Sequence, residues 1–150
     1  MLSPYPLKER DELAFEFVTD QGMRYLVYFL DYSIMFADYP EIEKRVYMFN
    51  IDPIEGDPDG SMADERIGLT VFQVFNMFFK ESQNVIVYVC DSLDNRHRSR
   101  KRKFDMWFWK FNDGSLIKED DVAIVDGIEI YNSMILHKHN EHLKETILAY

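Results

Sequence analysis

The sequence predicts an α+β fold, with a mixed, mostly antiparallel sheet in the element order β-β-β-α-β-α-β-β-α. Apolar runs typical of strands are interleaved with segments whose apolar residues recur every three to four positions, as on one face of a helix. The chain has 150 residues, of which 47% are hydrophobic and 15% aromatic, which is enough to build one core. No linker is long enough to separate two domains, so we expect a single domain over residues 1–150.

The first three strands are predicted to form a meander. Residues 13–19 alternate apolar and polar side chains, and a turn signal at 20–22 leads into residues 23–32, which are rich in Tyr, Phe, Val and Leu. Residues 45–51 form the third strand. Residues 52–60 concentrate Pro, Gly and Asp, so we expect a loop there.

A helix and a buried strand follow this loop. The helix is predicted over residues 67–82, with Ser61 as its N-cap and with Asp64 and Glu65 near its first turn, where carboxylates are favourable. Its apolar stripe is wide, so we expect this helix to be buried on more than one side. The continuous apolar run at 85–90 is typical of a central strand that is buried on both faces.

The C-terminal part adds a second long helix, a hairpin and a short final helix. The second helix covers residues 95–112, begins after the capping residue Asp94 and ends at residues 113–114, an Asp-Gly pair. A second Asp-Gly pair at 126–127 predicts a hairpin, because this dipeptide favours tight turns between strands. The hairpin strands are residues 122–125 and 128–136, and the final helix spans 140–150.

Composition indicates the compartment. The lone cysteine, Cys90, excludes an internal disulfide framework and fits a reducing environment, and we expect it to be a small core residue. No apolar run reaches the roughly 20 residues that cross a bilayer, and the first residues lack the features of a signal peptide. We therefore expect a cytoplasmic protein that does not enter membranes. The net charge of −10 disfavours binding of nucleic acid by the surface as a whole.

Residues 96–103 concentrate positive charge within this acidic chain. Outside that block, 11 basic residues stand against 27 acidic ones, a balance of −16. Such a concentration of one sign predicts a docking place for a negatively charged partner, although it can also neutralise carboxylates of the same molecule. The block contains no acid and six cations: Arg96, Arg98, Arg100, Lys101, Arg102 and Lys103.

Helical spacing divides the second long helix into an inward and an outward face. Extended backward, the inward apolar stripe passes through His97 and Arg100. Because an unpaired buried guanidinium is costly, these inward cations need carboxylate partners, and we expect a structural ion-pair network with Asp64, Asp91 or Asp94. The stripe itself consists of Phe104, Trp107, Phe108 and Phe111.

A binding site is the alternative interpretation of the same segment. The carboxyl end of strand 85–89 is a frequent place for ligands in α/β sheets. On the outward face of the helix, cations stand beside an aromatic ring, a combination that suits protein binding or base stacking, whereas a plain solvated face remains the simpler reading. The predicted ligand- or partner-binding residues are Asp91, Asp94, Arg96, Arg98, Arg102, Lys103 and Trp109.

Metal, cofactor and catalytic sites are not predicted. His137, His139 and His142 cluster near the C-terminus, but no second ligand motif accompanies them. The acids of residues 52–60 do not have the spacing of a calcium loop. No Ser-His-acid set and no Gly-x-Ser-x-Gly motif is present, so we expect no catalytic residue and no cofactor.

The element order resembles the core of the N-acetyltransferase fold that uses acetyl-coenzyme A, without that family's first strand and first two helices. The family holds the cofactor's pyrophosphate on a loop of pattern Arg-x-x-Gly-x-Gly or Ala before the central helix. Residues 57–68 here read Asp-Pro-Asp-Gly-Ser-Met-Ala-Asp-Glu-Arg-Ile-Gly, which lacks the pattern and carries four acids. The resemblance therefore concerns element order and does not license the activity.

A closer resemblance is to an uncharacterised family of small bacterial proteins. It covers most of the chain and implies a bacterial origin, but it transfers no activity. The residues that carry it are 64–70 (Asp-Glu-Arg-Ile-Gly-Leu-Thr), Phe78, Phe79, 89–96 (Val-Cys-Asp-Ser-Leu-Asp-Asn-Arg), Arg100, Arg102, Phe104, Trp107 and Phe108.

These observations favour a binding or regulatory module over an enzyme. The expected partner is an acidic protein, including a second copy of this chain, or a phosphate-bearing ligand, bound through helix 95–112. We also expect a homodimer, formed through Trp109 or through the apolar helix 67–79.

The rival interpretation is a degenerate acyl-coenzyme-A-dependent acyltransferase. A splay between the third strand and strand 85–89, lined with free backbone N–H groups, favours the rival, and a seam filled by side chains favours the module.

Overall fold

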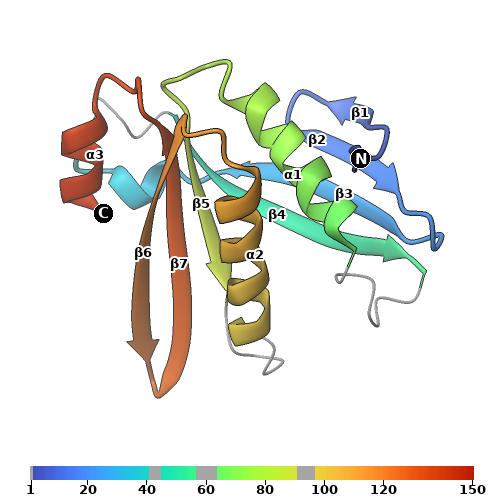
Figure 1. The fold of residues 1–150 in the computed structure, drawn as a ribbon. Helices are drawn as coiled ribbons and strands as arrows, with labels where there is room; N and C mark the ends of the chain where they lie inside the picture. The colour runs from blue at the N-terminus through green and yellow to red at the C-terminus, as the bar shows by residue number, and fades with distance from the viewer. Residues whose placement is uncertain (1, 41–44, 57–63, 91–96) are drawn as a thin grey trace.

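The computed structural model of the chain describes residues 2–40, 45–56, 64–90 and 97–150 (Figure 1). These residues form one seven-stranded mixed sheet with the strand order β1-β2-β3-β4-β5-β7-β6, together with three α-helices and a short 3-10 helix, η1. The predicted α+β class and the predicted order of elements are confirmed. The structure adds two short elements that the sequence did not indicate, the edge strand β1 (Lys8–Asp11) and η1 (Ser33–Phe36).

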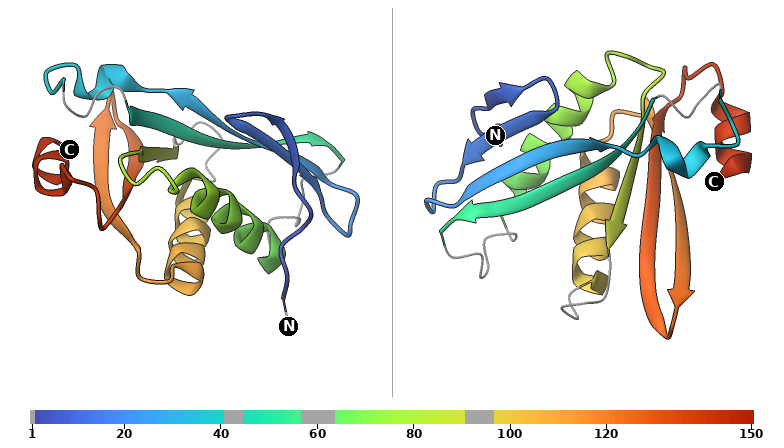
Figure 2. Two further views of the ribbon diagram at one scale, coloured as in Figure 1. Left: turned by 90° about the horizontal axis from the view of Figure 1, so that it is seen from above. Right: turned by 180° about the vertical axis from the view of Figure 1, so that it is seen from behind.

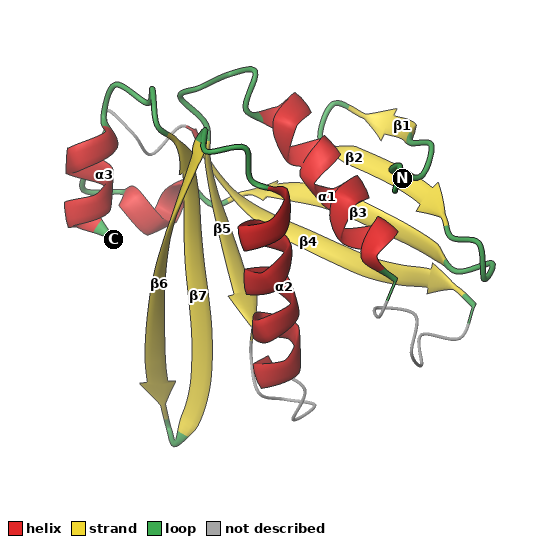
Figure 3. Ribbon diagram, in the orientation of Figure 1, coloured by secondary structure: helices red, strands yellow, loops and turns green. Residues whose placement is uncertain are grey.

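The N-terminal half of the sheet is an antiparallel meander (Figure 3). Its last strand continues past Ile51, so the prediction that a loop begins at residue 52 was wrong. Pro53 lies opposite Tyr25, next to a register shift and beyond the last residue of the strand that pairs with β5. Bulges and free edges tolerate proline, because no ladder hydrogen bond is lost there. After β1, the strands are β2 (Ala14–Val18), β3 (Arg24–Asp31) and β4 (Val46–Glu55).

The C-terminal half of the sheet joins the meander through a single parallel pair. Strand β5 (Val85–Cys90) pairs with β4 only from Val46↔Val85 to Met48↔Val87, and beyond that point the two strands diverge (Figure 1). On its other side, β5 pairs antiparallel with β7 (Ile128–His137), which pairs in turn with β6 (Leu116–Val125).

The β6–β7 hairpin confirms the predicted turn and is longer than predicted. Asp126 has φ 52° and Gly127 has φ 79°, the left-handed values that the favoured two-residue hairpin turns require. Strand β6 begins at Leu116 rather than at residue 122. The first half of β6 was not predicted because the stretch from Lys118 to Asp121 is charged. Charged residues are uncommon in strands, so such a stretch by itself indicates a loop.

Polar side chains bond to the backbone at both ends of the first long helix. Helix α1 (Glu65–Phe78) begins after Asp64, whose carboxylate accepts from the Arg66 N–H at 2.8 Å; the predicted N-cap at residue 61 lies outside the described residues. It stops short of residue 82, because the Asn84 amide donates to the Phe78 carbonyl at 3.1 Å. Helix α2 spans His97–Phe111, and residues 95 and 96 lie outside the described residues. The last helix, α3, is shorter than predicted and spans Leu143–Ala149.

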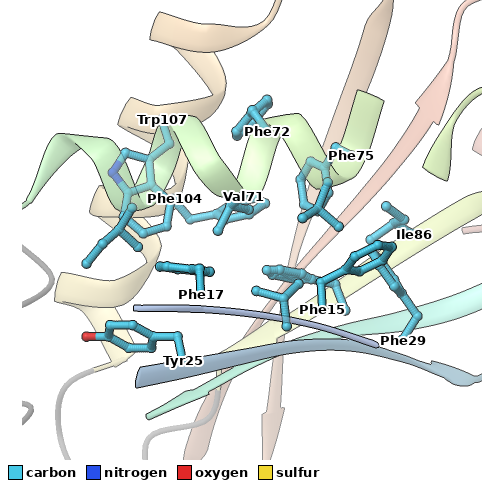
Figure 4. Close-up of a cluster of buried hydrophobic side chains, with 14 of the residues drawn as sticks. Phe15, Phe17, Tyr25, Phe29, Val71, Phe72, Phe75, Ile86, Phe104 and Trp107 are labelled. Carbon is cyan, nitrogen blue, oxygen red and sulfur yellow. The ribbon is translucent and has the colours of Figure 1, made fainter. Parts of the chain in front are cut away.

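The two long helices lie side by side on one face of the sheet, which we call the helix-covered face (Figure 2). Between them and the sheet lies the main core, which is largely aromatic (Figure 4). The opposite face is covered at one end by η1 and α3 (Figure 2). Of the helices in the described part of the chain, none combines the length and apolar character that a membrane crossing requires. The core side chains labelled in Figure 4 are Phe15, Phe17, Tyr25, Phe29, Val71, Phe72, Phe75, Ile86, Phe104 and Trp107.

Candidate functional site

The inward face of α2 is the predicted apolar stripe. Phe104 and Trp107 are buried, with 2% and 6% of their surface exposed, and Phe108 and Phe111 are half-buried. The rings of Phe108 and Phe111 lie 6.0 and 6.3 Å from that of Phe72 in α1. Packing against α1 and the sheet therefore fixes the rotation of α2 about its axis, and with it the direction of every charged side chain in the basic block.

Arg100 lies on the inward side, as the helical spacing predicted, and is half-buried. It lies beside the thiol of Cys90, the buried last residue of β5. Burial raises the pKa of the Cys90 thiol, and hydrogen bonding from Tyr88 and the nearby Arg100 cation oppose that rise. A thiol with a raised pKa is a poor nucleophile, which agrees with the prediction of a small core residue.

The acids expected to pair with the inward cations are only partly described. Asp91, Asp94 and Arg96 lie outside the described residues, and so does the side chain of His97. Asp64 caps α1 and accepts a short hydrogen bond from the Tyr5 hydroxyl of the N-terminal segment. Asp64 therefore ties the N-terminal segment to α1.

An ion cluster that the sequence did not indicate connects α2 to β6. Lys101 and Asp105 of α2 pair at 2.7 Å, and Lys118 of β6 pairs with Asp105 at 2.9 Å and with Asp120 at 2.6 Å. The Ser133 hydroxyl of β7 donates to Asp120 at 2.6 Å. Burial acts to raise the pKa of Asp120, but hydrogen bonds from Lys118 and Ser133 outweigh it, so this pKa lies below its ordinary value.

Only part of this cluster left a signal in the sequence. Lys101 and Asp105 are four residues apart on a helix, a spacing that brings side chains together. Lys118 and Asp120 are two residues apart and share one face of a strand. No local sequence pattern indicates that the Lys101–Asp105 pair lies next to the Lys118–Asp120 pair, because that contact depends on how α2 packs against the sheet.

The outward side of α2 is less neutralised than the inward side. Arg98 is tied to the hairpin, since its guanidinium pairs with Glu129 at 3.0 Å. Arg102 is exposed and donates to the Ser99 hydroxyl at 3.4 Å; neither it nor the half-buried Lys103 forms an ion pair with a described residue. Trp109 has 83% of its surface exposed, and Met106 has 59%. We call Arg102, Lys103, Met106 and Trp109 the outward face.

Other candidates offer less chemistry. Within the described ranges, no group of three or more His, Cys, Asp or Glu side chains is placed to hold a metal ion. A hollow of about 270 Å³ lies beside β1, β2 and β3. Its buried carboxylate, Glu16, is already bonded to Arg10 and Arg24. Helix α1 offers less apolar surface for dimerisation than its sequence suggests, because Ile67, Val71, Val74 and Phe75 are buried inside the chain.

The comparison with protein families agrees with the closer of the two resemblances. The family model described as a family of unknown function, DUF6169, matches residues 63–150. That range contains α1, β5, α2, both hairpin strands and α3, and hence the outward face and the ion cluster. No curated protein and no solved structure matches the chain. The chain therefore belongs to DUF6169, a family of unknown function.

Proposed function

We propose that this chain is a non-enzymatic binding module of the bacterial cytoplasm, and that it engages an anionic partner through the outward face of α2. The observation that carries the proposal is the juxtaposition of Arg102 with the 83% exposed Trp109 on one side of a firmly packed helix. Tryptophan and arginine are the residues that most often dominate binding energy in protein interfaces. The partner is an acidic protein surface or a phosphate-bearing ligand.

Rigidity supports the proposal. The inward stripe of α2 is buried, and the ion cluster joins the helix to β6. Side chains on such a helix lose little conformational freedom when a partner binds, since the backbone is already ordered. The four residues of the outward face lie within about two helical turns, so a partner can contact all of them at once.

Charge supports it as well. The chain carries a net charge of −10, so a partner attracted to Arg102 and Lys103 is repelled by most of the remaining surface. Screening limits the attraction to about 8–10 Å at ordinary salt. We therefore expect binding that is weak, local and sensitive to salt.

Titration of poly-glutamate and of inorganic polyphosphate at low salt tests the proposal. The wild-type chain should bind one of them, and the double substitution Arg102→Gln with Lys103→Gln should remove that binding without loss of fold. Arg98→Gln should have a smaller effect, because Glu129 already holds this guanidinium. A matched control removes two exposed lysines elsewhere, Lys138→Gln with Lys144→Gln.

Two results contradict the proposal. One is the absence of binding to either probe at low salt. The other is an equal loss of affinity in the double variant and in its control, since attraction would then follow net charge and not the outward face.

A second candidate, a degenerate acyltransferase, is favoured by the early divergence of β4 and β5 after Met48↔Val87. Two features count against it. On the helix-covered face the gap holds the rings of Phe49, Tyr88 and Phe104, whose centroids are 4.3–6.2 Å apart. The N-terminus of α1, where a pyrophosphate would need free N–H groups, is capped by the carboxylate of Asp64. Calorimetric titration with acetyl-coenzyme A separates the two candidates, and binding would support the acyltransferase.

A further inference from the structure

The two edges of the sheet differ in a way that points to strand pairing. At one edge, β1 is short, and all four of its side chains, Lys8–Asp11, are charged and exposed. Short charged strands protect a sheet edge from pairing. At the other edge, β6 runs over Leu116–Val125, and among the described residues no strand pairs with its outer side. Its last part is apolar and exposed, with Val122 at 47%, Ile124 at 71% and Val125 at 53%.

The first part of β6 has the opposite character. Lys118 is followed by three acids, residues 119–121, and only then by the apolar stretch 122–125. The acidic stretch of one β6 repels the acidic stretch of another. When the second strand runs in the opposite direction, the acidic stretch of each copy can instead lie opposite the apolar stretch of the other. We infer that β6 pairs antiparallel with β6 of a second copy of this chain, about a two-fold axis at Val122, and extends the sheet across two molecules.

An axis nearer the turn than Val122 and residue 123 leaves few residues of β6 to pair, because the strand ends at Val125. Among the remaining axes, avoiding like charges sets the register. With the helix-covered faces of both copies on the same side, each residue lies opposite the one equally far from the axis on the other copy. An axis at residue 121 sets Asp121 against its own copy, and an axis at 123 sets Asp120 against Asp126. Like charges directly opposite each other destabilise a pair. An axis at Val122 sets Glu119, Asp120 and Asp121 opposite Val125, Ile124 and Ala123, and it sets Lys118 opposite Asp126.

The basic helix favours the same occupant. Lys118 and Asp120 contact α2, so by alternation Val122 and Ile124 also point to the helix-covered face. Ile124 lies opposite Glu129 of β7, which holds Arg98 of α2. In the inferred register, Asp120 of the second copy lies opposite Ile124. Glu129, Ile124 and that Asp120 then form one row across the sheet, on the face that carries the basic helix α2. The pairing concerns the sheet edge and does not depend on the role proposed for the outward face.

Among the elements of the described ranges, none covers the outer side of the apolar half of β6. Figure 1 shows α2 beside β7 and β5, and α3 near the opposite end of the hairpin from its turn. The turn at residues 126–127 projects beyond the body of the molecule (Figures 1 and 2). A second β6 can therefore approach the apolar half of the strand, next to the turn.

Cysteine cross-linking tests both the pairing and its register. Directly opposed residues of antiparallel strands have Cα atoms about 4.5–5.5 Å apart, within the range of about 4.4–6.8 Å that a disulfide spans. Val122→Cys should therefore form disulfide-linked dimers on mild oxidation. The matched control is Val18→Cys, on β2, where the valine is 43% exposed against 47% for Val122. Both variants retain Cys90, which is buried.

Sedimentation supplies the second arm of the test. The wild-type chain at micromolar concentration should have a mass of about 36 kDa, twice the 18.0 kDa of one chain. Ile124→Lys should give a monomer with an unchanged circular dichroism spectrum, since this side chain is 71% exposed. A wild-type monomer, a dimer that persists in Ile124→Lys, or equal cross-linking of the two cysteine variants overturns the inference. None of these measurements involves polyanion binding, so the two proposals can fail separately.

Discussion

The indole ring of Trp107 in α2 lies directly against Gly68 in α1. A Cβ atom built on Gly68 would come within 2.4 Å of Trp107 Cδ1 and 2.5 Å of Trp107 Cγ. Contacts this short do not occur, so no residue larger than glycine fits at this position unless the indole moves. The missing side chain therefore sets how closely the two helices approach.

Gly68→Ala is expected to destabilise the fold. In an exposed helix this change stabilises by roughly 0.5–1 kcal/mol, because glycine is a poor helix former. Here the added methyl group overpacks the core, at a cost of about 1–3 kcal/mol, so the net change should be unfavourable. Urea denaturation gives the free energy of unfolding.

A double-mutant cycle controls for this mechanism. Trp107→Leu makes room at the same place, so Gly68→Ala should cost less in the Trp107→Leu background than in the wild type. Strictly additive effects would show that the cost of Gly68→Ala does not come from the indole.

Trp107→Ala and Trp109→Ala should separate packing from exposure. Trp107 is 6% exposed and part of the main core, so its removal should cost about 3–5 kcal/mol. Trp109 is 83% exposed, and its removal should change stability by no more than about 0.5 kcal/mol. Thermal denaturation of the two variants measures both effects. A large loss in Trp109→Ala would mean that this ring is covered in solution.

Lys118→Met should be markedly destabilising. Lys118 is 11% exposed and lies between Asp105 and Asp120, so its removal leaves the two carboxylates with Lys101 as their one remaining cation, at 2.7 Å from Asp105 and 3.8 Å from Asp120. Losing a hydrogen bond to a charged group costs on the order of 1.5–3 kcal/mol. Chemical denaturation measures the loss.

The surface pair Arg45–Glu81 provides the matched control for the ion cluster. Its partners are 49% and 48% exposed, and Arg45→Met should cost about 0–1 kcal/mol, as exposed pairs do. Equal costs for the two methionine variants would mean that the cluster contributes no more than a surface pair.

Stability should fall in acid partly through Asp120. Its pKa in the folded chain is below the ordinary value of about 3.9, so its contribution is complete above that pH and is lost as the pH falls through the folded pKa. Asp120→Asn should therefore flatten the dependence of unfolding free energy on pH below about 4. The exposed Asp38→Asn serves as control, and a variant curve parallel to the wild type would exclude Asp120 as a source of the acid dependence.

What could be predicted from the sequence was local. Helical spacing alone placed Phe104 and Trp107 inward and Trp109 outward, and the residue pair at 126–127 located the hairpin turn before any contact was known. Arg98 shows the limit of such reasoning. It is exposed, but its guanidinium pairs with Glu129 of a different element, so its neutralisation could be found only from the packing.

The errors have the same origin. The charged start of β6 is typical of a loop, but in the fold Lys118 pairs with Asp105 of α2, which stabilises it in a strand. Pro53 is typical of a strand end, but it is tolerated in β4 because the pairing of β4 with β5 stops at Met48. In both cases a residue that is unfavourable by itself is tolerated because of a neighbour distant in sequence.

The brief β4–β5 pairing also has a mechanical consequence. The backbone ladder between the two halves of the sheet spans only Val46↔Val85 to Met48↔Val87, so side chains do most of the work of holding the halves together. Phe49 and Tyr88 flank the divergence, and Phe104 of α2 lies across both rings. Under a pulling force applied across this junction, the sheet should separate here first. The force required should depend more on the packing of α2 against the core than on the few backbone hydrogen bonds that break.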